Sequence, residues 1–537
     1  MENNKNMNPI FSLKNFRSFG QDGADFELAP ITVLTGCNSA GKSSLVKALM
    51  LLSHSAGDVR KTDNLQIFSK DLCLGGYKNV AHEDGKIIMS YRVWSAGLQE
   101  TLVVTRKYSA KPKDELNDGS LCQLTVEKSD GTLIYQEEPD GSGFPNQVYH
   151  CDAIREEFNR FYAVGCYMRV TELLPILEKR EKNSIDNELP QFKRAEEAIR
   201  IVNERLKSVG VDESDAVLLW KEFDHDAFKS VIRALDPLGH GDTVAFSDLI
   251  KTPDEGGGKE YMLEAFIDYI VNEACCPSFV QQPVYINSAS AQIERLYTVG
   301  NENKMCNALR ELNNRKIRYH NLHPDILCDP YCIHHKPGSF LDKWIDKFKI
   351  GKSIKVKGTD QGLGLMAYLI NYTKEERLLA DEGYGITQLV ALLLQIDNCI
   401  PIMLNCDEDT WLKEEKVVYN YKPKTICVEE PEVHLHPKYQ SLLAEMFVEA
   451  HQKYNIQFII ETHSEYLIRK LQVMIADKKH ALSPNDVSLN YVEKDENGVS
   501  TNRKIEIMED GRLGSSFGDG FFDEAGSLSR KLFTLNK

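Results

Sequence analysis

The sequence predicts an α/β fold with mixed sheets and a helical insertion, and three features support this prediction. Residues 31–34 (ITVL) form a β-branched run that leads through a glycine-containing loop into the helix-forming residues 45–50 (LVKALM). Far along the chain, the apolar runs 426–428 (ICV) and 458–460 (FII) each end in polar residues, as buried strands do. In between, from about residue 151 to residue 274, the sequence becomes helical and charged.

The remaining patterns suggest three units. Further strand-like segments lie in the first part of the chain, at residues 10–13, 26–28, 86–94 and 121–128. A stripe with steps of three and four residues, typical of a helix that faces a core, is formed by Phe192, Ala195, Ile199, Val202 and Leu206. The glycine run 256–258 predicts a loop in the same region. We expect an N-terminal lobe at 1–150, a helical insertion at 151–280 and a C-terminal lobe at 281–537.

The composition indicates a folded protein without a membrane span. At 537 residues the chain is too long for one compact core, and its 42% hydrophobic and 27% charged content is that of globular proteins. The most apolar stretch, residues 389–406, contains Gln395, Asp397 and Asn398, and the first residues lack a signal-peptide core. The thirteen cysteines are scattered and odd in number, which indicates reduced thiols. We therefore expect a cytoplasmic protein, and its net charge of −16 argues against general adhesion to nucleic acid.

The loop at residues 36–44 (GCNSAGKSS) has the spacing of a phosphate-binding P-loop between a strand and a helix. Glycines let successive backbone N–H groups turn toward a phosphate, and the helix N-terminus adds a positive dipole. Lys42 would reach the β- and γ-phosphates, and the Ser43 hydroxyl would bind Mg²⁺, which prefers oxygen ligands. The predicted nucleotide-binding residues of this loop are Gly36, Asn38, Gly41, Lys42, Ser43 and Ser44.

Polar residues at two distant strand ends supply the groups that ATP hydrolysis needs. Glu429 and Glu430 follow the strand at 426–428, and we expect Glu429 to anchor Mg²⁺ through its water shell and Glu430 to deprotonate the attacking water. His463, shortly after the strand at 458–460, could hydrogen-bond the γ-phosphate or the water. A single histidine is more often structural, but its company with Lys42 and Glu430 favours a sensor. The expected catalytic residues are Glu430, His463 and Lys42.

A second glycine-containing turn lies at residues 383–385 (GYG), ahead of the apolar helix 389–396. With Thr387 near the helix start, this turn offers backbone N–H groups, a hydroxyl and a positive dipole to an anion. One P-loop rarely needs a second phosphate-binding turn. We therefore expect a composite site, in which Gly383, Gly385 and Thr387 close over ATP that another subunit holds.

These motifs, in this order, resemble those of ABC-type ATPases of the SMC, RecF and OLD group. More narrowly, the chain resembles the stand-alone bacterial AAA-type ATPases, with an ABC fold, of antiphage defence systems such as Septu, PARIS and retron-associated operons. The opening segment 13–20 (LKNFRSFG) and the closing segment 510–524 (DGRLGSSFGDGFFDE) resemble the two ends of that subgroup, whereas region 151–274 takes no part. The resemblance implies a P-loop NTPase of ABC-ATPase type without an appended nuclease domain.

The resemblance also implies a role for each motif. These roles are Walker A at Gly36, Gly41, Lys42 and Ser43, Walker B at Glu429 and Glu430, the ABC signature at Gly383, Gly385 and Thr387, the D-loop at 434–437 and the switch histidine at His463. Glu429 stands where aspartate is commoner and Thr387 where serine is usual. No Q-loop glutamine matches, and Asn79 and His82 are the two alternatives for its place, so we expect slow hydrolysis.

On this basis we expect an ATP-driven switch in which two copies close head to tail over ATP and Mg²⁺ and control a separate effector, a nuclease or a toxin. The 73 residues after Ser464 are too few for the nuclease domain that OLD-type enzymes append, and long coiled-coil arms and membrane-coupling features are not expected. Two alternatives stay open. One is a nucleotide-stabilised scaffold that holds an effector inactive, and the other is a RecF-like repair ATPase that binds DNA.

Two further patterns have competing interpretations. A short stretch gathers His320, His323, Cys328, Cys332, His334 and His335, but their spacing fits no standard zinc finger, so an ordinary loop is favoured. Residues 343–357 carry six lysines interleaved with Trp344, Phe348 and Ile354. Such a segment could follow the phosphates of DNA while its aromatic rings stack on bases. A solvated face with its apolar residues turned inward is favoured over that interpretation.

Overall fold

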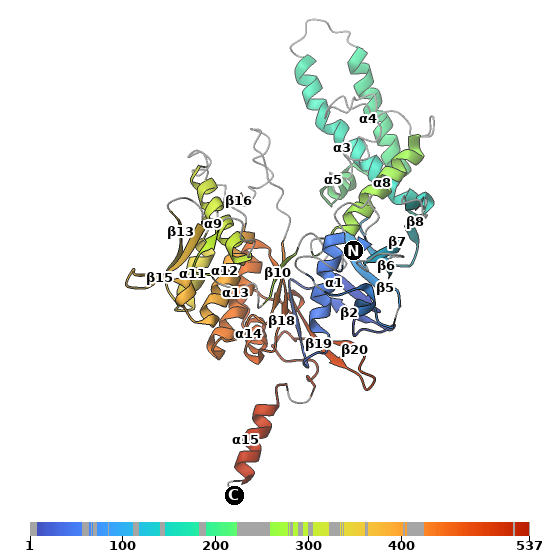
Figure 1. Cartoon of the computed structure of the whole chain (residues 1–537). Coiled ribbons are helices and arrows are strands. Elements are labelled where there is room, and N and C mark those ends of the chain that lie inside the picture. Colours follow the sequence, from blue (N-terminus) through green and yellow to red (C-terminus); the bar gives the residue numbers. More distant parts are fainter. Residues whose placement is uncertain are drawn as a thin grey trace.

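The computed structural model shows sheets and helices gathered in one body, from which two helical parts project (Figure 1). It describes residues 8–55, 64–65, 67, 72, 74–83, 85–110, 118–139, 145–181, 190–222, 258–277, 279, 283–287, 294–298, 304–321, 333–334, 336, 338–359, 364–400, 403–404, 424–518 and 521–535. In these ranges, no helix is long and apolar enough to cross a membrane. The α/β fold class with mixed sheets is as predicted.

Six strands form a mostly parallel central sheet. Their order is β10 (Val284–Ile286), β17 (Thr425–Glu429), β18 (Gln457–Glu461), β3 (Ile31–Gly36), β19 (Val487–Lys494) and β20 (Ser500–Ile505). Each neighbouring pair is parallel except β19 with β20. The N-terminal strand β3 therefore lies among strands from the C-terminal part of the chain, and β18 separates it from β17.

Helices cover both faces of the central sheet, which explains why its strands are apolar on both sides. α1 (Lys42–Ser55) packs on one face, and three helices pack on the other: α12 (Tyr384–Cys399), α13 (Pro437–Tyr454) and α14 (Glu465–Ala476) (Figure 1). α14 begins sharply because the Ser464 hydroxyl accepts the N–H of Leu467 at 3.1 Å. The predicted apolar helix 389–396 lies inside α12.

A second, antiparallel sheet is built from the N-terminal part of the chain. Its order is β2 (Ala24–Glu27), β1 (Ile10–Lys14), β5 (Ile87–Ser95), β6 (Glu100–Ala110), β7 (Gly119–Lys128), β8 (Leu133–Pro139) and β9 (Pro145–Tyr149), with β4 (Asn64–Leu65) paired to β7. The short helix α2 (Tyr77–Val80) precedes β5. Alternating burial along β5 shows that one face of this sheet packs on the core.

The helical region projects from this second sheet. It contains α3 (Arg155–Glu181), α4 (Pro190–Ser208), α5 (Glu213–Glu222) and α8 (Gly258–Cys275), and α3 and α4 rise side by side (Figure 1). Val202 and Leu206 of the predicted stripe are buried on α4, whereas the side chains of Phe192 and Ala195 lie outside the described part. α8 is fixed to the sheet where Glu273 accepts the Ser95 hydroxyl at 2.9 Å. Of the predicted glycine loop, only Gly258 is described, at the start of α8.

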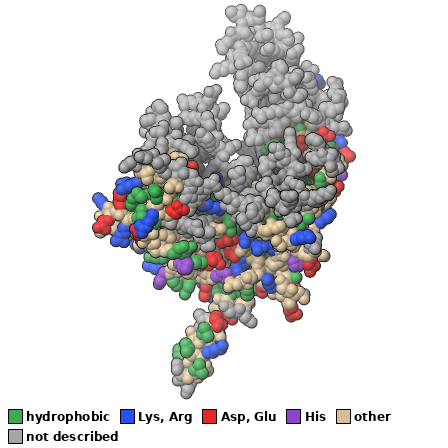
Figure 2. All heavy atoms as spheres, viewed as in Figure 1, with side chains coloured by type: hydrophobic (Ala, Val, Ile, Leu, Met, Phe, Trp, Pro, Cys, Tyr) green, Lys and Arg blue, Asp and Glu red, His purple; other side chains and the backbone are tan. Residues whose placement is uncertain are grey.

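Smaller elements complete the fold. They are the strands β11 (Tyr297–Thr298), β12 (Ile333–His334), β13 (Ser353–Gly358), β14 (Gly364–Ile370), β15 (Glu376–Leu378) and β16 (Met403–Leu404) with the helices α9 (Lys304–Asn321), α11 (Ser339–Lys347) and α15 (Glu524–Leu535). α15 extends away from the body at the C-terminal end, with Leu532 and Phe533 exposed (Figures 1 and 2). The proposed zinc cluster at residues 320–335 falls largely on residues outside the described part, and no contact among its side chains is described.

The lysine-rich segment 343–357 packs as a solvated face. Trp344 and Phe348 are fully buried and Ile354 is nearly so, because these side chains point into the core. Buried rings cannot stack on bases, so the structure contradicts the base-stacking interpretation of this segment. Basic and acidic side chains are also intermixed on the face shown in Figure 2, rather than separated into a basic stripe.

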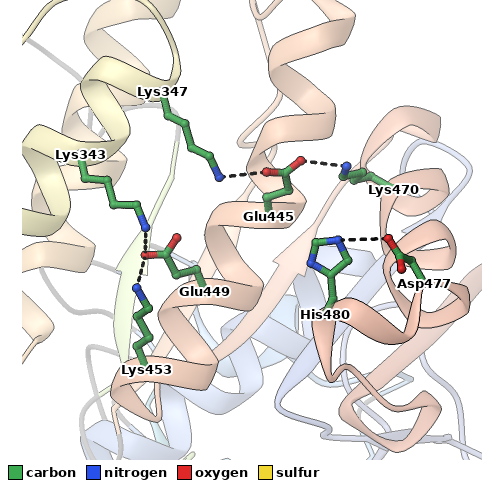
Figure 3. A network of polar contacts seen from close by, with 8 residues as sticks. All are labelled: Lys343, Lys347, Glu445, Glu449, Lys453, Lys470, Asp477 and His480. Carbon is green, nitrogen blue, oxygen red and sulfur yellow. Dashed lines mark hydrogen bonds and ion pairs between the residues drawn. The ribbon is translucent and has the colours of Figure 1, made fainter.

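The lysines of α11 take part in what we call the lysine–glutamate network. Its ion pairs are Lys343–Glu449 (2.5 Å), Lys453–Glu449 (3.2 Å), Lys347–Glu445 (3.0 Å) and Lys470–Glu445 (2.8 Å), and they join α11, α13 and α14 (Figure 3). Farther along the same segment, Lys355 and Lys357 both pair with Glu376. These pairs reduce the positive charge that the segment could offer to nucleic acid.

Candidate nucleotide-binding site

Residues from distant parts of the chain line one cavity of about 670 Å³ where β3, β17 and β18 end. Parallel strands end at the same edge of a sheet, so the loops that follow them meet there. The lining residues are Arg17, Ser18, Asn38, Ser39, Gly41, Lys42, Ser43, Ser44, Lys47, Asn79, Glu430, Glu461 and His463. The structure thus brings together most of the predicted P-loop residues with the predicted base and sensor, whereas Gly36 and Glu429 do not line the cavity.

The P-loop needs its two glycines for steric as well as conformational reasons. Gly36 has a φ of 135° and Gly41 a φ of 104°, a region that favours glycine. A Cβ on Gly36 would lie 2.0 Å from the Val492 carbonyl oxygen of β19, and one on Gly41 would lie 2.6 Å from the Ser18 hydroxyl. The packing of the neighbouring strand therefore accounts for Gly36, in addition to the curl of the loop that the sequence predicted.

Lys42 is folded onto its own loop. Its Nζ donates to the carbonyl oxygens of Gly36 at 3.2 Å and Cys37 at 2.8 Å, and its side chain is 4% exposed. Burial lowers the pKa of Lys42, while the nearby Glu461 and Glu430 oppose this shift. A buried ammonium group at the edge of a cavity is placed to bind an anion that enters it.

Glu461 lies next to Ser43. The Ser43 hydroxyl donates to Glu461 Oε1 at 3.0 Å, although the two residues are 418 positions apart. Glu461 ends β18 and is paired in register with Glu429 on β17, so the two side chains lie on the same face of the sheet. Burial raises the pKa of Glu461, the Ser43 hydrogen bond opposes this shift, and repulsion from Glu429 adds to it.

Glu430 has a φ of 47°, the left-handed region that non-glycine residues rarely adopt. Its N–H donates to the Glu461 carbonyl oxygen at 2.8 Å, which holds this backbone in place while its side chain lines the cavity. Backbone held in such a conformation is concentrated at functional sites. Several other described residues, such as Lys374 and Asn455, share this conformation, so the role of Glu430 stays a prediction that its place in the cavity lining favours.

Glu432 supports the other side of the site. Its Oε1 accepts the His463 N–H at 2.6 Å, so it fixes the backbone that carries the predicted sensor. Burial raises the pKa of Glu432, although hydrogen bonds from Thr462 and His463 oppose this shift. Burial also lowers the pKa of the His463 imidazole, Lys42 lowers it further and Glu430 opposes both. His463 therefore favours its neutral form, which can donate one hydrogen bond and accept another.

The second glycine turn stays outside this cavity. Gly383 caps the N-terminus of α12 and is exposed, whereas Gly385 packs so closely on the His434 carbonyl oxygen that a Cβ would lie 2.5 Å from it. The Thr387 hydroxyl donates to the Tyr384 carbonyl oxygen at 2.7 Å and is buried with its helix. Within one chain the helix backbone takes up this hydroxyl, and the expectation that Thr387 closes over ATP held by another subunit stays a prediction.

Several lining residues were not predicted as site residues. Arg17 and Lys47 add positive charge to the cavity, and Asn79, one of the two candidates for the Q-loop position, lines it while His82 does not. Arg17 belongs to the opening segment 13–20, whose family resemblance was the only indication in the sequence. Glu461 and Glu432 stand beside predicted residues, but nothing in their local pattern sets them apart from structural carboxylates.

The cavity fits a nucleoside triphosphate with a divalent cation. Lys42, Lys47 and Arg17 supply positive charge for phosphates, and Ser43 offers a hydroxyl to a hard cation. One oxygen each of Glu429, Glu432 and Glu461 is buried without a hydrogen-bond partner among the residues that the structure describes, a costly arrangement that a bound cation or water would relieve. Among the described residues, no three His, Cys, Asp or Glu side chains form a metal site, but Mg²⁺ held largely by phosphates needs no such group.

A strand–P-loop–helix unit joined to carboxylates from neighbouring parallel strands is the architecture of the P-loop nucleotide-binding fold. The comparisons with known families agree. Residues 280–468 match a family described as "AAA ATPase domain", and residues 11–209 match one described as "AAA domain". Residues 482–532 match a family described as "Protein of unknown function (DUF3696)". The two AAA matches include the P-loop, both glutamates and His463.

The solved structures that this chain matches include heads of SMC proteins. They include the SMC head domain from Thermotoga maritima (10% identity, TM-score 0.33, 93% of this chain and 98% of that chain). Another is the Smc head domain with a coiled coil and joint from Pyrococcus yayanosii (14% identity, TM-score 0.34, 93% of this chain and 97% of that chain). Likeness at this level carries no argument about the function of this chain. No curated protein matches it.

Proposed function

We propose that this protein is an ATP-binding and ATP-hydrolysing switch subunit of a bacterial antiphage defence complex. Two copies close head to tail over two ATP molecules with Mg²⁺, and closure or reopening controls a separate effector, a nuclease or a toxin. One observation carries the ATPase part of this proposal. Lys42 and Ser43 share a cavity with Glu430 and His463, which lie 387 and 420 residues after Ser43 in the sequence.

The chain's own groups divide the work of binding. Lys42 exchanges its two loop carbonyl partners for phosphate oxygens, and the positive end of α1 and the Arg17 guanidinium add further attraction for phosphate. Ser43 and the neighbouring carboxylates provide oxygen ligands for Mg²⁺. When bound, Mg²⁺ neutralises phosphate charge and orients the β- and γ-phosphates.

Two side chains serve the chemical step. Glu430 accepts the proton of the attacking water, because it is the carboxylate of the Glu429–Glu430 pair that lines the cavity. His463, held in place by Glu432, hydrogen-bonds the γ-phosphate or that water as a neutral imidazole. Binding by Lys42 and proton transfer by Glu430 are therefore separable by mutation.

The exposed turn at Gly383 supports the head-to-tail dimer. It lies at the N-terminus of a 16-residue helix and is not among the residues that line the cavity of its own chain. An exposed helix N-terminus with glycines can approach a phosphate closely. A second copy brings this turn to the cavity, and the shared nucleotide couples ATP binding to association.

A dimer with two different mutations tests the composite site. Lys42→Ala removes the phosphate ligand, and Gly383→Glu places a negative charge on the turn, where a Cβ meets no atom within 4 Å. Each variant alone should lose ATP hydrolysis. Co-expressed with two different tags and purified through both, every mixed dimer keeps one intact site and should show up to about half of the wild-type activity. No recovery, with both chains folded and Gly383→Glu still binding ATP, would contradict the composite site.

Phosphate release followed together with molar mass separates the switch from the scaffold alternative. The switch predicts ATP-dependent doubling of mass with repeated turnover, whereas ATP-dependent assembly without turnover would favour the scaffold. The assignment to antiphage defence and to an effector rests on the sequence resemblance of segments 13–20 and 510–524. Co-purification from the native operon, with identification of the bound protein by mass spectrometry, tests it. Recovery of a DNA-repair partner and binding to DNA ends would favour the RecF-like alternative instead.

A further inference from the structure

We propose that Glu461, rather than Glu429, supplies the carboxylate that binds Mg²⁺ together with Ser43. The inference rests on the proposed function, because it assumes that ATP with Mg²⁺ occupies the cavity, and it assigns the cation to a residue outside the Glu429–Glu430 pair. The strand order is its first support. β18 lies between β3 and β17, so the residue that ends β18 is one strand nearer to the P-loop strand than Glu429 is.

The contacts of the two glutamates also place Glu461 nearer to the P-loop than Glu429. Glu461 Oε1 accepts the Ser43 hydroxyl at 3.0 Å, and Glu461 lines the cavity. Glu429 does neither among the described contacts, and its neighbour on β10 is Tyr285, whose pKa it raises after burial. Both glutamates lie on the same face of the sheet, but only Glu461 contacts Ser43 and lines the cavity among the described contacts.

One oxygen of Glu461, like one oxygen of Glu429, has no hydrogen-bond partner among the described residues. The side chain is 6% exposed, and its Oε2 is buried without a hydrogen bond in the described structure. The charge of Lys42 acts on Glu461, but the Lys42 Nζ donates to two loop carbonyls. A buried carboxylate oxygen that its own chain leaves unpaired is costly unless a ligand completes it.

Mg²⁺ is the ligand that suits this arrangement. It takes oxygen ligands in near-octahedral geometry and in nucleotide sites uses one or two carboxylates beside phosphate oxygens. The oxygen of the Ser43 hydroxyl can bind the cation while its O–H still donates to Glu461, so the two side chains can bind the cation together. Within the described residues no glutamine lines the cavity, which leaves Glu461 as the carboxylate in contact with Ser43.

Nucleotide binding with and without Mg²⁺ tests the assignment in the full-length protein. A fluorescent ATP analogue would be titrated in Mg²⁺ and in EDTA, for the wild type, Glu461→Gln and Glu429→Gln. In the wild type, Mg²⁺ should raise the affinity for the ATP analogue relative to EDTA. In Glu461→Gln this increase should be smaller by a factor of about ten or more. The affinity of Glu461→Gln in EDTA should stay equal or rise, because a negative charge near the phosphates is gone. Glu429→Gln should keep most of the increase that Mg²⁺ produces. Electron paramagnetic resonance of Mn²⁺ with the same nucleotide should show weaker cation binding in Glu461→Gln than in Glu429→Gln and the wild type.

The matched control is Glu465→Gln. Glu465 lies four residues after Glu461, is partly exposed and pairs with Arg469 on α14, so its variant should behave as the wild type. If Glu461→Gln retains the full Mg²⁺ effect, or if Glu429→Gln alone loses it, the assignment is overturned while the ATP site stands. If the wild type binds the analogue under neither condition, the proposed function itself falls.

A second variant distinguishes a loss of Mg²⁺ binding from a loss of the fold. Glu461→Asp keeps the charge but shortens the arm, so it should weaken binding in Mg²⁺ more than binding in EDTA. Equal weakening under both conditions would mean that Glu461 only supports the fold, and it would overturn the proposal.

Discussion

The nucleotide cavity and the lysine–glutamate network handle charge in opposite ways. Beside the cavity, Glu429, Glu432 and Glu461 each keep one buried oxygen without a protein hydrogen-bond partner in the described structure. In the network, Glu445 and Glu449 each contact two lysines (Figure 3). Burying an unpaired charge costs free energy, whereas a half-exposed ion pair changes the free energy of folding little. The cavity is thus arranged for a ligand that its own chain does not supply, and the network is complete by itself.

The pKa directions show the same difference. Burial raises the pKa of Glu461 and of Glu432, and the hydrogen bonds they accept do not cancel this effect. Burial also acts on Glu445, but its ion pairs with Lys470 and Lys347 hold its pKa below the usual value. The variants below test this contrast from the largest expected effect to the smallest.

Glu430→Gln should produce the largest effect. Loss of the general base should lower the rate of ATP hydrolysis by about 10²–10⁴-fold, while ATP affinity stays near that of the wild type. The closed dimer should then accumulate in ATP, which phosphate release and light scattering can follow. Hydrolysis at the wild-type rate would show that the assignment of the base is wrong.

Lys42→Ala should weaken ATP binding by about 100-fold, since a charge-assisted bond to phosphate is lost. Titration calorimetry measures the affinity directly. Lys453→Ala, in the network, is the matched control and should leave it unchanged. Wild-type affinity in Lys42→Ala would mean that the bonds of Lys42 to Gly36 and Cys37 brace the loop and serve no ligand.

Asp342→Asn tests a buried charge on α11, the helix that carries two lysines of the network. Burial raises the pKa of Asp342 to about 6, although Lys316 opposes the shift. The folded state therefore holds this proton more tightly than the unfolded state, and wild-type stability should fall as the pH rises from about 4 through 6. The variant lacks this loss and should be more stable than the wild type at pH 8 by about 1 kcal/mol, with little difference near pH 4. The melting temperatures of the two proteins would be measured across this pH range. A constant difference between them at every pH would contradict the raised pKa of Asp342.

Glu449→Gln should have the smallest effect. Two partly exposed pairs, with Lys343 and Lys453, contribute no more than about 1 kcal/mol to the free energy of unfolding. The melting temperature should fall slightly, and less so at high salt, while ATP hydrolysis stays unchanged. A large loss of ATP hydrolysis would show that the lysine–glutamate network affects catalysis in the cavity.

Local patterns in the sequence were enough to find the main strands and most of the cavity. The β-branched run before Gly36 and the apolar run before Glu429 are strands β3 and β17, and both glutamates and His463 lie where the strands end. These features depend on residues close together in the chain, so periodicity and turn chemistry reveal them.

The order of the strands could not be predicted in the same way. Nothing local to residues 458–460 says that their strand separates β3 from β17, since that pairing joins segments hundreds of residues apart. For the same reason, the contact between Ser43 and Glu461 was missed. The role of Thr387 stays a prediction, because a hydroxyl near a helix start can bind a ligand or bond the preceding turn, as it does here within one chain, and only the composite site would decide between them.

Strand β19 ties the matched segment 482–532 to the phosphate loop. It pairs with β3 from Val487 to Val492 and leaves no room for a side chain at residue 36. Just beyond it, the Ser500 hydroxyl donates to the Ala40 carbonyl oxygen at 2.6 Å. A shortened chain that stops at residue 468, where the match to the AAA ATPase family ends, would bare one edge of β3 and free the loop. Anyone who dissects this protein must keep both ends of the polypeptide, because a truncation that looks safe by family boundaries would cut through a shared sheet.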